Sequence, residues 1–235
     1  MSTGGFVAVD DIGHWCRGWL APTPGFMQRA SHVLIDREGV AWIIDPVDCP
    51  LLDDAVGDHT VAGVVQLMER HNRDSEAVAA RLDVPLLRVP DTGEGTPFTV
   101  IPVVDAARIG WHEVALWWPE RDTMVVADAL GTTGYHCRPG ERVGVHPILR
   151  VARPPWRLAG YPVRHLVCGH GAGVHGEGTG LVPAAAVAVL VDVEVRRHSV
   201  EAHRCPQPEE LRCAASGGAG RGGFTHRSDP PRAVP

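Results

Sequence analysis

Three polar residues of this chain could together bind a metal ion. Each stands just beyond a short apolar run, Asp74 after residues 61–67, Asp128 after residues 123–127 and His170 after residues 165–168. Carboxylates and imidazoles are the ligands found in catalytic zinc, manganese and iron sites. Glycines on both sides of His170 indicate a tight backbone around a functional side chain. Taken singly, an aspartate after a strand also serves as a helix cap, and a loop histidine often has no ligand role.

The first of these residues lies in the stretch around which the rest of the chain is organised, Val61–Pro85. Its apolar, β-branched start predicts a buried strand over Val61–Leu67. Charged and polar residues follow, and from Ser75 the apolar residues recur at three and four positions, which predicts a helix with Asp74 or Ser75 as its N-cap. Ligands gather at the carboxyl ends of strands in α/β proteins, so this loop is a candidate site. An ordinary solvated loop would have the same composition.

The remaining elements are predicted from β-branched runs, turn residues and helical spacing. Strands are expected over residues 32–36 and 40–45, which form a hairpin, and over residues 84–90, 98–104, 113–118, 123–127 and 165–168. Helices are expected over residues 51–58 and 179–195, an irregular or edge-strand start over residues 1–30, and mostly loop over residues 131–162. Strands dominate both halves, which favours two packed sheets with helices outside over a strictly alternating parallel sheet.

Composition narrows the functional classes. The 235 residues carry a formal net charge of -6 without a basic stripe, which argues against nucleic-acid binding because phosphate neutralisation needs clustered basic residues. The longest uncharged stretch near the end, residues 178–191, is shorter than the ~20 residues of a membrane span. Six cysteines without a C-x-x-C pair, and no signal-like N-terminus, predict reduced thiols in a cytoplasmic protein.

Four segments between residues 31 and 177 resemble the metallo-β-lactamase superfamily. They are VAWIIDPV, VVQLMERHNRDSEAVAARLDVP, HEVALWWPERDTMVVADAL and HLVCGHGAGVHG. The resemblance implies an α+β fold, a four-layer αβ/βα sandwich of two packed mixed sheets with outer helices. We expect the whole domain to span residues 1–195. Residues 196–235 have low complexity and no apolar pattern, so we predict a disordered tail there.

The resemblance also implies which residues bind metal. In the superfamily, the aspartate of a strand ending like VVADAL bridges two metal ions and a Gly-His-Gly segment supplies a late histidine, here Asp128 and His170. The superfamily's loop H-x-H-x-D-H keeps only Asp74, because arginine, asparagine and serine occupy its histidine positions. One of the two metal positions is thereby lost. We therefore expect at most one ion, zinc or another divalent metal, bound by Asp74, Asp128 and His170.

Other residues of the same motifs are further candidates for the site. A second alignment of the loop gives His71 the place of a family histidine, and His112 lies three residues from the place of the middle one. Arg70 and Arg73 belong to an R-H-x-R-D pattern that, with the ending G-H-G-x-G-V-H-G, resembles a subgroup of the superfamily. Four more histidines could add ligands or could be loop residues without a ligand role: His14, His136, His146 and His175.

Two functions fit this pattern. The first is a metal-dependent hydrolase with Asp74 and Asp128 as catalytic residues and a small-molecule substrate; hydrolysis of a small ester or thioester is implied by the resemblance alone. The second is a catalytically inactive relative, a binding or regulatory module in which Arg70 replaces the metal ion and pairs with Asp74 and Asp128. A third interpretation is a two-layer α/β protein that shares these motifs by chance.

Overall fold

The computed structural model describes residues 5–22 and 27–176. The helix predicted over residues 179–195 and the tail predicted from residue 196 lie outside the described residues. Among the helices that the structure describes, none is long and apolar enough to cross a membrane.

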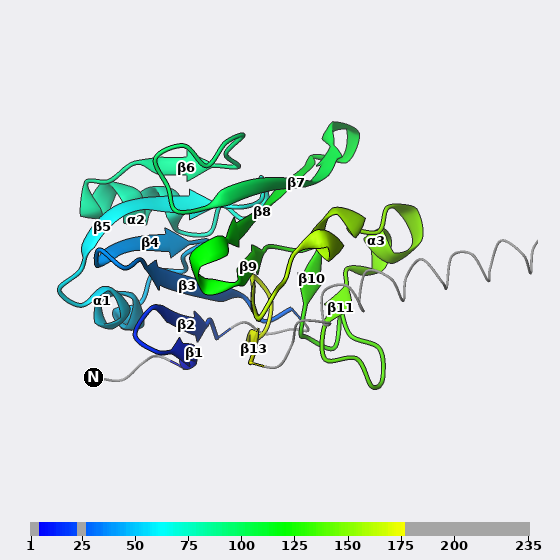
Figure 1. The fold of residues 1–235 in the computed structure, drawn as a ribbon, viewed down its shortest axis with the longest axis horizontal. Coiled ribbons are helices and arrows are strands. Elements are labelled where there is room, and N and C mark those ends of the chain that lie inside the picture. The colour runs from blue at the N-terminus through cyan, green and yellow to red at the C-terminus, as the bar shows by residue number, and fades with distance from the viewer. Residues whose placement is uncertain (1–4, 23–26, 177–235) are drawn as a thin grey trace, which may run out of the picture. The chain divides into compact units, whose positions relative to one another are not determined.

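Six strands form the first sheet, in the order β1-β2-β3-β4-β5-β6 (Figure 1). They are β1 (Val7–Ile12), β2 (Cys16–Leu20), β3 (Ala30–Ile35), β4 (Val40–Ile44), β5 (Thr60–Gln66) and β6 (Leu86–Arg88). The first four strands are antiparallel neighbours, whereas β4, β5 and β6 run parallel. Parallel neighbours need a crossover connection. Two helices, α1 (Pro50–Val56) and α2 (Ser75–Leu82), lie in these connections.

The second sheet has five strands in the order β13-β12-β9-β8-β7. They are β7 (Thr99–Ala106), β8 (Trp111–Trp118), β9 (Thr123–Val126), β12 (His165–Cys168) and β13 (Val174–His175). Only β9 and β12 pair in parallel. A separate pair joins β10 (Leu130–Gly131) to β11 (Gly144–Val145), and α3 (Pro147–Ala152) and the 3₁₀ helices η1 (Ala107–Ile109), η2 (Pro119–Arg121) and η3 (Trp156–Gly160) complete the described elements.

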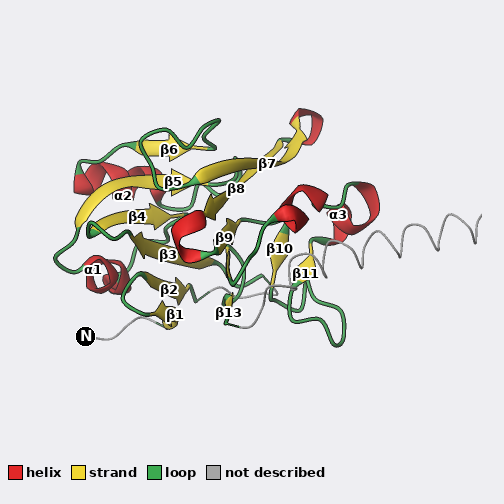
Figure 2. Ribbon diagram, in the orientation of Figure 1, coloured by secondary structure: helices red, strands yellow, loops and turns green. Residues whose placement is uncertain are grey.

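Apolar residues on both faces of the first sheet build two cores. Successive side chains of a strand point to opposite faces, so Leu34 and Ile44 pack toward the second sheet while Val33 and Ile43 pack with the residues of α1 and α2. Figure 2 shows the two helices beside the first sheet. These layers explain why β3 is buried along its whole length. The structure confirms the predicted α+β sandwich of two mixed sheets.

Most predicted elements are present, and their ends differ from the predicted ones by at most two residues. The predicted hairpin corresponds to β3 and β4, joined by a turn in which the Asp36 carboxylate accepts hydrogen bonds from the backbone of Glu38 and Val40. The first 30 residues are more regular than predicted, because β1 and β2 pair with each other and β2 pairs with β3. Residues 131–162 also contain α3 and η3, whose apolar residues Leu149 and Leu158 join the main core.

The aromatic centre of the main core predicts where truncation is most costly. Trp118 is fully buried, and its ring meets the edges of Trp15 and Phe98 at centroid distances of 5.5 and 5.6 Å. We expect Trp118→Ala to lower the free energy of unfolding by about 3–5 kcal/mol, because a large cavity replaces the ring. Urea unfolding measures this loss. Trp156→Ala is the matched control, since Trp156 is 61% exposed, and it should change stability by less than about 0.5 kcal/mol.

Candidate metal centre

Three buried side chains direct their ligand atoms at one point. His71 Nε2 lies 2.9 Å from Asp128 Oδ1, His170 Nε2 lies 2.8 Å from the same oxygen, and the two Nε2 atoms are 3.2 Å apart. All three residues are at least nine-tenths buried. Within the described residues, this is the one group of three or more ligand-type side chains that converge closely enough to share an ion.

The ends of four strands bring these residues together. Asp128 follows β9 and His170 follows β12, the two parallel strands of the second sheet. His71 lies in the loop after β5, and Asp45 follows β4, its parallel neighbour in the first sheet. Because parallel strands present their carboxyl ends at the same edge, each sheet contributes two polar residues to one site.

Asp45 holds the imidazole of His71 from behind. Its Oδ2 lies 2.9 Å from His71 Nδ1, and its Oδ1 accepts a hydrogen bond of 3.0 Å from the backbone N–H of Leu67. Asp45 has a positive φ of 43°, a backbone conformation that aspartate tolerates better than most residues. A carboxylate behind a histidine fixes the orientation of the ring, as it does for histidines that bind metals.

Arg73 places a half-buried cation beside the centre. Its guanidinium donates hydrogen bonds to the backbone carbonyls of Ala30, Asp45 (2.8 Å) and Gly169 (2.9 Å). These carbonyls belong to β3, the end of β4 and the end of β12, so one side chain joins both sheets at the site. Burial lowers the pKa of Arg73, while the Asp45 and Asp128 carboxylates raise it. The guanidinium therefore compensates part of the negative charge of the centre.

The glycine before His170 is required by close approach. A Cβ atom at Gly169 would lie 3.0 Å from the carbonyl oxygen of Ala127 and 3.2 Å from His71 Cε1. Gly171 has a φ of 82°, and a Cβ there would lie 2.3 Å from Thr132 Oγ1. The tight backbone predicted around His170 is confirmed.

The carboxylates and imidazoles of the centre shift one another's pKa values. Burial opposes ionisation of Asp128, but hydrogen bonds from His170 and His71 hold the pKa of its carboxyl far below the usual range. Burial and Arg73 lower the pKa of His71, yet Asp45 and Asp128 outweigh them and raise it. Without an ion, the two carboxylates favour the protonated form of the His71 ring.

The donor set fits a divalent metal ion. Two imidazole nitrogens and one carboxylate oxygen are common ligands of zinc. In a tetrahedral zinc site with bonds of about 2.0–2.1 Å, neighbouring ligand atoms lie about 3.3 Å apart, close to the 2.8–3.2 Å observed here. Lone pairs aimed at one point repel unless a proton or cation lies between them. His71 has the supporting carboxylate of Asp45, whereas His170 Nδ1 has no hydrogen-bond partner among the described residues.

Two further buried residues surround the centre. Glu113 accepts hydrogen bonds from Trp111 Nε1 (2.9 Å) and from the backbone N–H of Ala129 (2.8 Å), the residue after Asp128. Burial, reinforced by the negative charge of Asp128, raises the pKa of Glu113 to about 7. The ring of His136 stacks on that of His170 at 5.8 Å. Burial and the proximity of His170 lower the pKa of His136 to about 4, so its ring is neutral at pH 7.

The structure brings Asp128 and His170 together as predicted, but it places Asp74 elsewhere. The Asp74 carboxylate accepts a hydrogen bond of 2.8 Å from the backbone N–H of Asp48, and His71 occupies the third ligand position. The loop turns inward at His71, so that its neighbours in sequence point to other surroundings.

The other candidates lie around the centre without joining it. Arg70 is exposed, and its guanidinium lies 4.9 Å from the ring centroid of Trp111. The expected pair of Arg70 with Asp128 is not formed, because two imidazoles occupy that carboxylate. His112 pairs with Asp105 at 3.1 Å. His14 and His146 also lie outside the convergent group.

Sequence reasoning missed Asp45, Glu113 and the primary role of His71. Asp45 stands directly after the buried strand β4, and a polar residue just beyond a strand is the same signal that identified Asp128 and His170. Glu113 carries no comparable signal, because it lies within the strand β8.

A second cluster anchors the segment that carries His170. Asp10 accepts hydrogen bonds from His32 Nε2 (2.8 Å), His175 Nε2 (2.9 Å) and the backbone N–H of Gly173 (2.8 Å). It thereby joins β1 to β3 and to the residues that follow His170. Asp10 also has a positive φ of 55°. His175, a predicted site residue, therefore supports the centre from a distance.

The solved structures that this chain resembles have the metallo-β-lactamase fold. VMB-1 matches with a TM-score of 0.54 and 11% identity over 81% of this chain and 99% of that chain. The DIM-1 metallo-beta-lactamase matches with a TM-score of 0.52 and 13% identity over 78% and 97%. A metallo-beta-lactamase from Pontibacter korlensis matches with a TM-score of 0.52 and 13% identity over 76% and 98%. No protein-family model and no curated protein matches the sequence.

The Asp10 cluster predicts a specific acid sensitivity. Burial raises the pKa of Asp10, but the hydrogen bonds from His175 and His32 outweigh burial and lower it well below its usual range. A carboxyl whose pKa is lower in the folded state stabilises the protein above its unfolded pKa of about 3.9 and loses this effect as the pH falls below it. We expect Asp10→Asn to lower the free energy of unfolding by about 2 kcal/mol at pH 7.

Chemical unfolding of both proteins between pH 7 and pH 3 tests this expectation. The difference between Asp10→Asn and the parent should shrink as the pH falls. Asp11→Asn is the control, because Asp11 is the exposed neighbour, and it should follow the parent at every pH. An Asp10→Asn difference that is constant with pH would contradict the assignment.

Proposed function

We propose that this protein is a metal-dependent hydrolase in which His71, Asp128 and His170 bind one divalent ion, zinc by the chemistry of the donor set. The observation that carries the proposal is the convergence of three buried ligand atoms within 3.2 Å of one another. The carboxylate of Asp45 behind His71 is the second support. The fold is a third, because metallo-beta-lactamases with solved structures share it.

Charge favours a single ion. Asp45 and Asp128 contribute two negative charges, and the guanidinium of Arg73 compensates one of them. One divalent ion then leaves the centre with a net charge of about +1, whereas a second would add repulsion in a poorly solvated site. The loop also offers no ligands for a second ion, since Asp74 bonds to the backbone of Asp48 and Arg70, a cation that cannot bind a metal ion, lies over Trp111.

The side chains of the chain prepare the centre for hydrolysis. Asp45 keeps the proton of His71 on Nδ1, so that Nε2 can act as a ligand. Asp128 stays ionised because its pKa is strongly lowered. His136 stays neutral and adds no positive charge beside His170. When bound, a divalent ion supplies Lewis-acid activation of a carbonyl group and of a water nucleophile.

The substrate that we propose is a small ester or thioester, as the sequence resemblance implies. Asp128 retains the catalytic role predicted for it, whereas Asp74 is outside the ligand group and has no catalytic role in this proposal. The cytoplasm remains our proposed location. Free thiols support it, since the described cysteines Cys16, Cys49, Cys137 and Cys168 form no disulfides.

A second candidate function is a metal-free binding module on the same fold. Both ring nitrogens of His71 already lie within hydrogen-bond distance of a carboxylate. Asp45, His71 and Asp128 therefore form a complete hydrogen-bond network without an ion. In this alternative the positive charge comes from the His71 imidazolium and from Arg73, and not from Arg70 as the sequence suggested.

Metal content separates the two candidates. We expect protein purified without chelators to contain about one equivalent of divalent metal, measured by elemental mass spectrometry. Asp128→Asn and His170→Gln should each lose the ion, because two ligands hold a metal far more weakly than three. His112→Gln should retain it, since His112 lies outside the centre. A parent protein that stays metal-free after loading with zinc, manganese and iron would support the metal-free module.

Asp45 provides a finer test of the centre. Asp45→Asn preserves the shape and tolerates the positive φ, but it leaves either Leu67 N–H or His71 Nδ1–H without an acceptor. We expect the affinity for zinc to fall by about 10–100-fold. Competition with a chelating dye measures this affinity. Asp48→Asn is the control, because Asp48 is exposed and pairs with Arg81, and an equal loss there would argue against a specific role of Asp45.

A further inference from the structure

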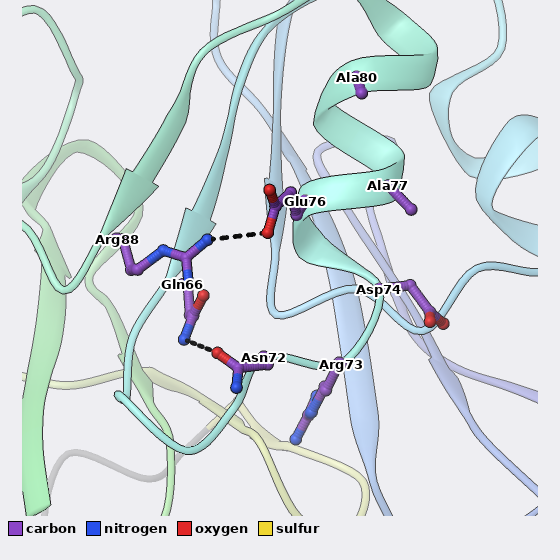
Figure 3. A pocket seen from close by; sticks show the side chains of 8 residues that line it. All are labelled: Gln66, Asn72, Arg73, Asp74, Glu76, Ala77, Ala80 and Arg88. Carbon is purple, nitrogen blue, oxygen red and sulfur yellow. Dashed lines mark hydrogen bonds and ion pairs between the residues drawn. The ribbon is translucent and has the colours of Figure 1, made fainter.

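A cavity lies beside the loop that carries His71. It has a volume of about 540 Å³ and opens where β5 and β6 end and α2 begins (Figure 3). Polar and charged residues dominate its wall, and two alanines of α2 complete it. The lining residues are Gln66, Asn72, Arg73, Asp74, Glu76, Ala77, Ala80 and Arg88. None of them is a ligand of the proposed metal centre.

Gln66 presents an unused acceptor in this wall. Its side chain is fully buried, and the two N–H groups of Nε2 are shared among three acceptors, the carbonyls of Met68 (2.8 Å) and Glu69 (3.2 Å) and Asn72 Oδ1 (3.2 Å). Three acceptors around the nitrogen fix the orientation of the amide. Oε1 has no hydrogen-bond partner among the described residues and points toward Arg88 (Figure 3). A buried acceptor without a donor is costly, so a ligand hydroxyl would find a prepared partner.

The start of α2 presents unused donors in the same wall. Asp74 stands at the N-cap position, but its side chain makes no capping bond and accepts from Asp48 instead. In the described part of the chain, the backbone N–H groups of Glu76 and Ala77 have no acceptor, whereas Ser75 and Val78 donate to preceding carbonyls. Free N–H groups at a helix N-terminus favour an anion.

Arg88 adds a positive charge that is easily redirected. Its guanidinium pairs with Glu76 at 3.4 Å, and both side chains are exposed, so the pair contributes little stability. The guanidinium of Arg73 is engaged with backbone carbonyls and extends away from Arg88 (Figure 3). The carboxylate of Asp74 also points away from Gln66 (Figure 3). An entering anion would therefore compete only with Glu76.

We propose that this cavity binds a small organic anion that carries hydroxyl groups. The carboxylate or phosphate of the ligand accepts from the N–H groups of Glu76 and Ala77 and from Arg88, and a hydroxyl group donates to Gln66 Oε1. A hydroxyl suits this acceptor better than an ammonium group, because Arg88 already contributes a positive charge to the same wall. The site is independent of the proposed hydrolase activity.

Titration calorimetry of the full-length protein tests the chemistry of the ligand. Gluconate and glycerol 3-phosphate serve as hydroxylated anions with a carboxylate and a phosphate, and at least one should bind saturably. Propionate lacks a hydroxyl and should bind at least about tenfold more weakly, because it cannot form the hydrogen bond to the buried acceptor. Glycerol, which lacks the charge, should not bind detectably. Absence of binding by both hydroxylated anions, or equal binding of propionate, would overturn the proposal.

Variants on the surface of the cavity locate the binding without disturbing the core. Arg88→Gln should weaken binding by about tenfold, and Ala77→Asp should abolish it by placing a carboxylate at the helix N-terminus. Arg37→Gln is the matched control, since Arg37 forms an exposed ion pair of the same 3.4 Å length with Glu120, and it should bind like the parent. Undiminished binding in Arg88→Gln and Ala77→Asp would place the anion elsewhere, including at a bound metal, and would refute this site.

Discussion

The imidazole of His71 is the interaction on which the rest of this structure depends. It lies between Asp45, which ends a strand of the first sheet, and Asp128, which ends a strand of the second. One ring thus joins the two halves of the sandwich at the edge where ligands bind. The loop that carries the ring is shaped by Gln66, whose amide nitrogen bonds to the carbonyls of Met68 and Glu69. The metal centre and the neighbouring cavity therefore share one support.

The positive charge of Arg73 offsets the repulsion between the Asp45 and Asp128 carboxylates. Two carboxylates in a poorly solvated site repel each other, and a buried charge without a partner is strongly destabilising. The guanidinium of Arg73 lies near both carboxylates but donates its hydrogen bonds to backbone carbonyls. It compensates charge without blocking the ligand atoms of His71 and Asp128. Arg70, three residues earlier in the same loop, is exposed over Trp111 and contributes nothing comparable.

The fold was largely predictable because its signals are local. A run that is apolar at every position, as in β4, must be buried on both faces, and such strands belong to the middle of a layered structure. Residues 131–162 and the first strands were less predictable. Their pairing is set by contacts distant in sequence, such as β2 with β3, and their composition of glycine, proline and arginine carries little periodicity.

By itself, the sequence determined most of the strands, the helix at Ser75, and the candidacy of Asp128 and His170, because each depends on residue type and on position within a short segment. Tertiary structure decided the rest of the site. It chose His71 over Asp74 because the backbone turns inward at one residue of a polar loop, and no local pattern distinguishes their directions. It also recruited Asp45 and Arg73, whose partners lie 26 and 96 residues away in sequence. Only the packing of the two sheets brings such partners within hydrogen-bond distance.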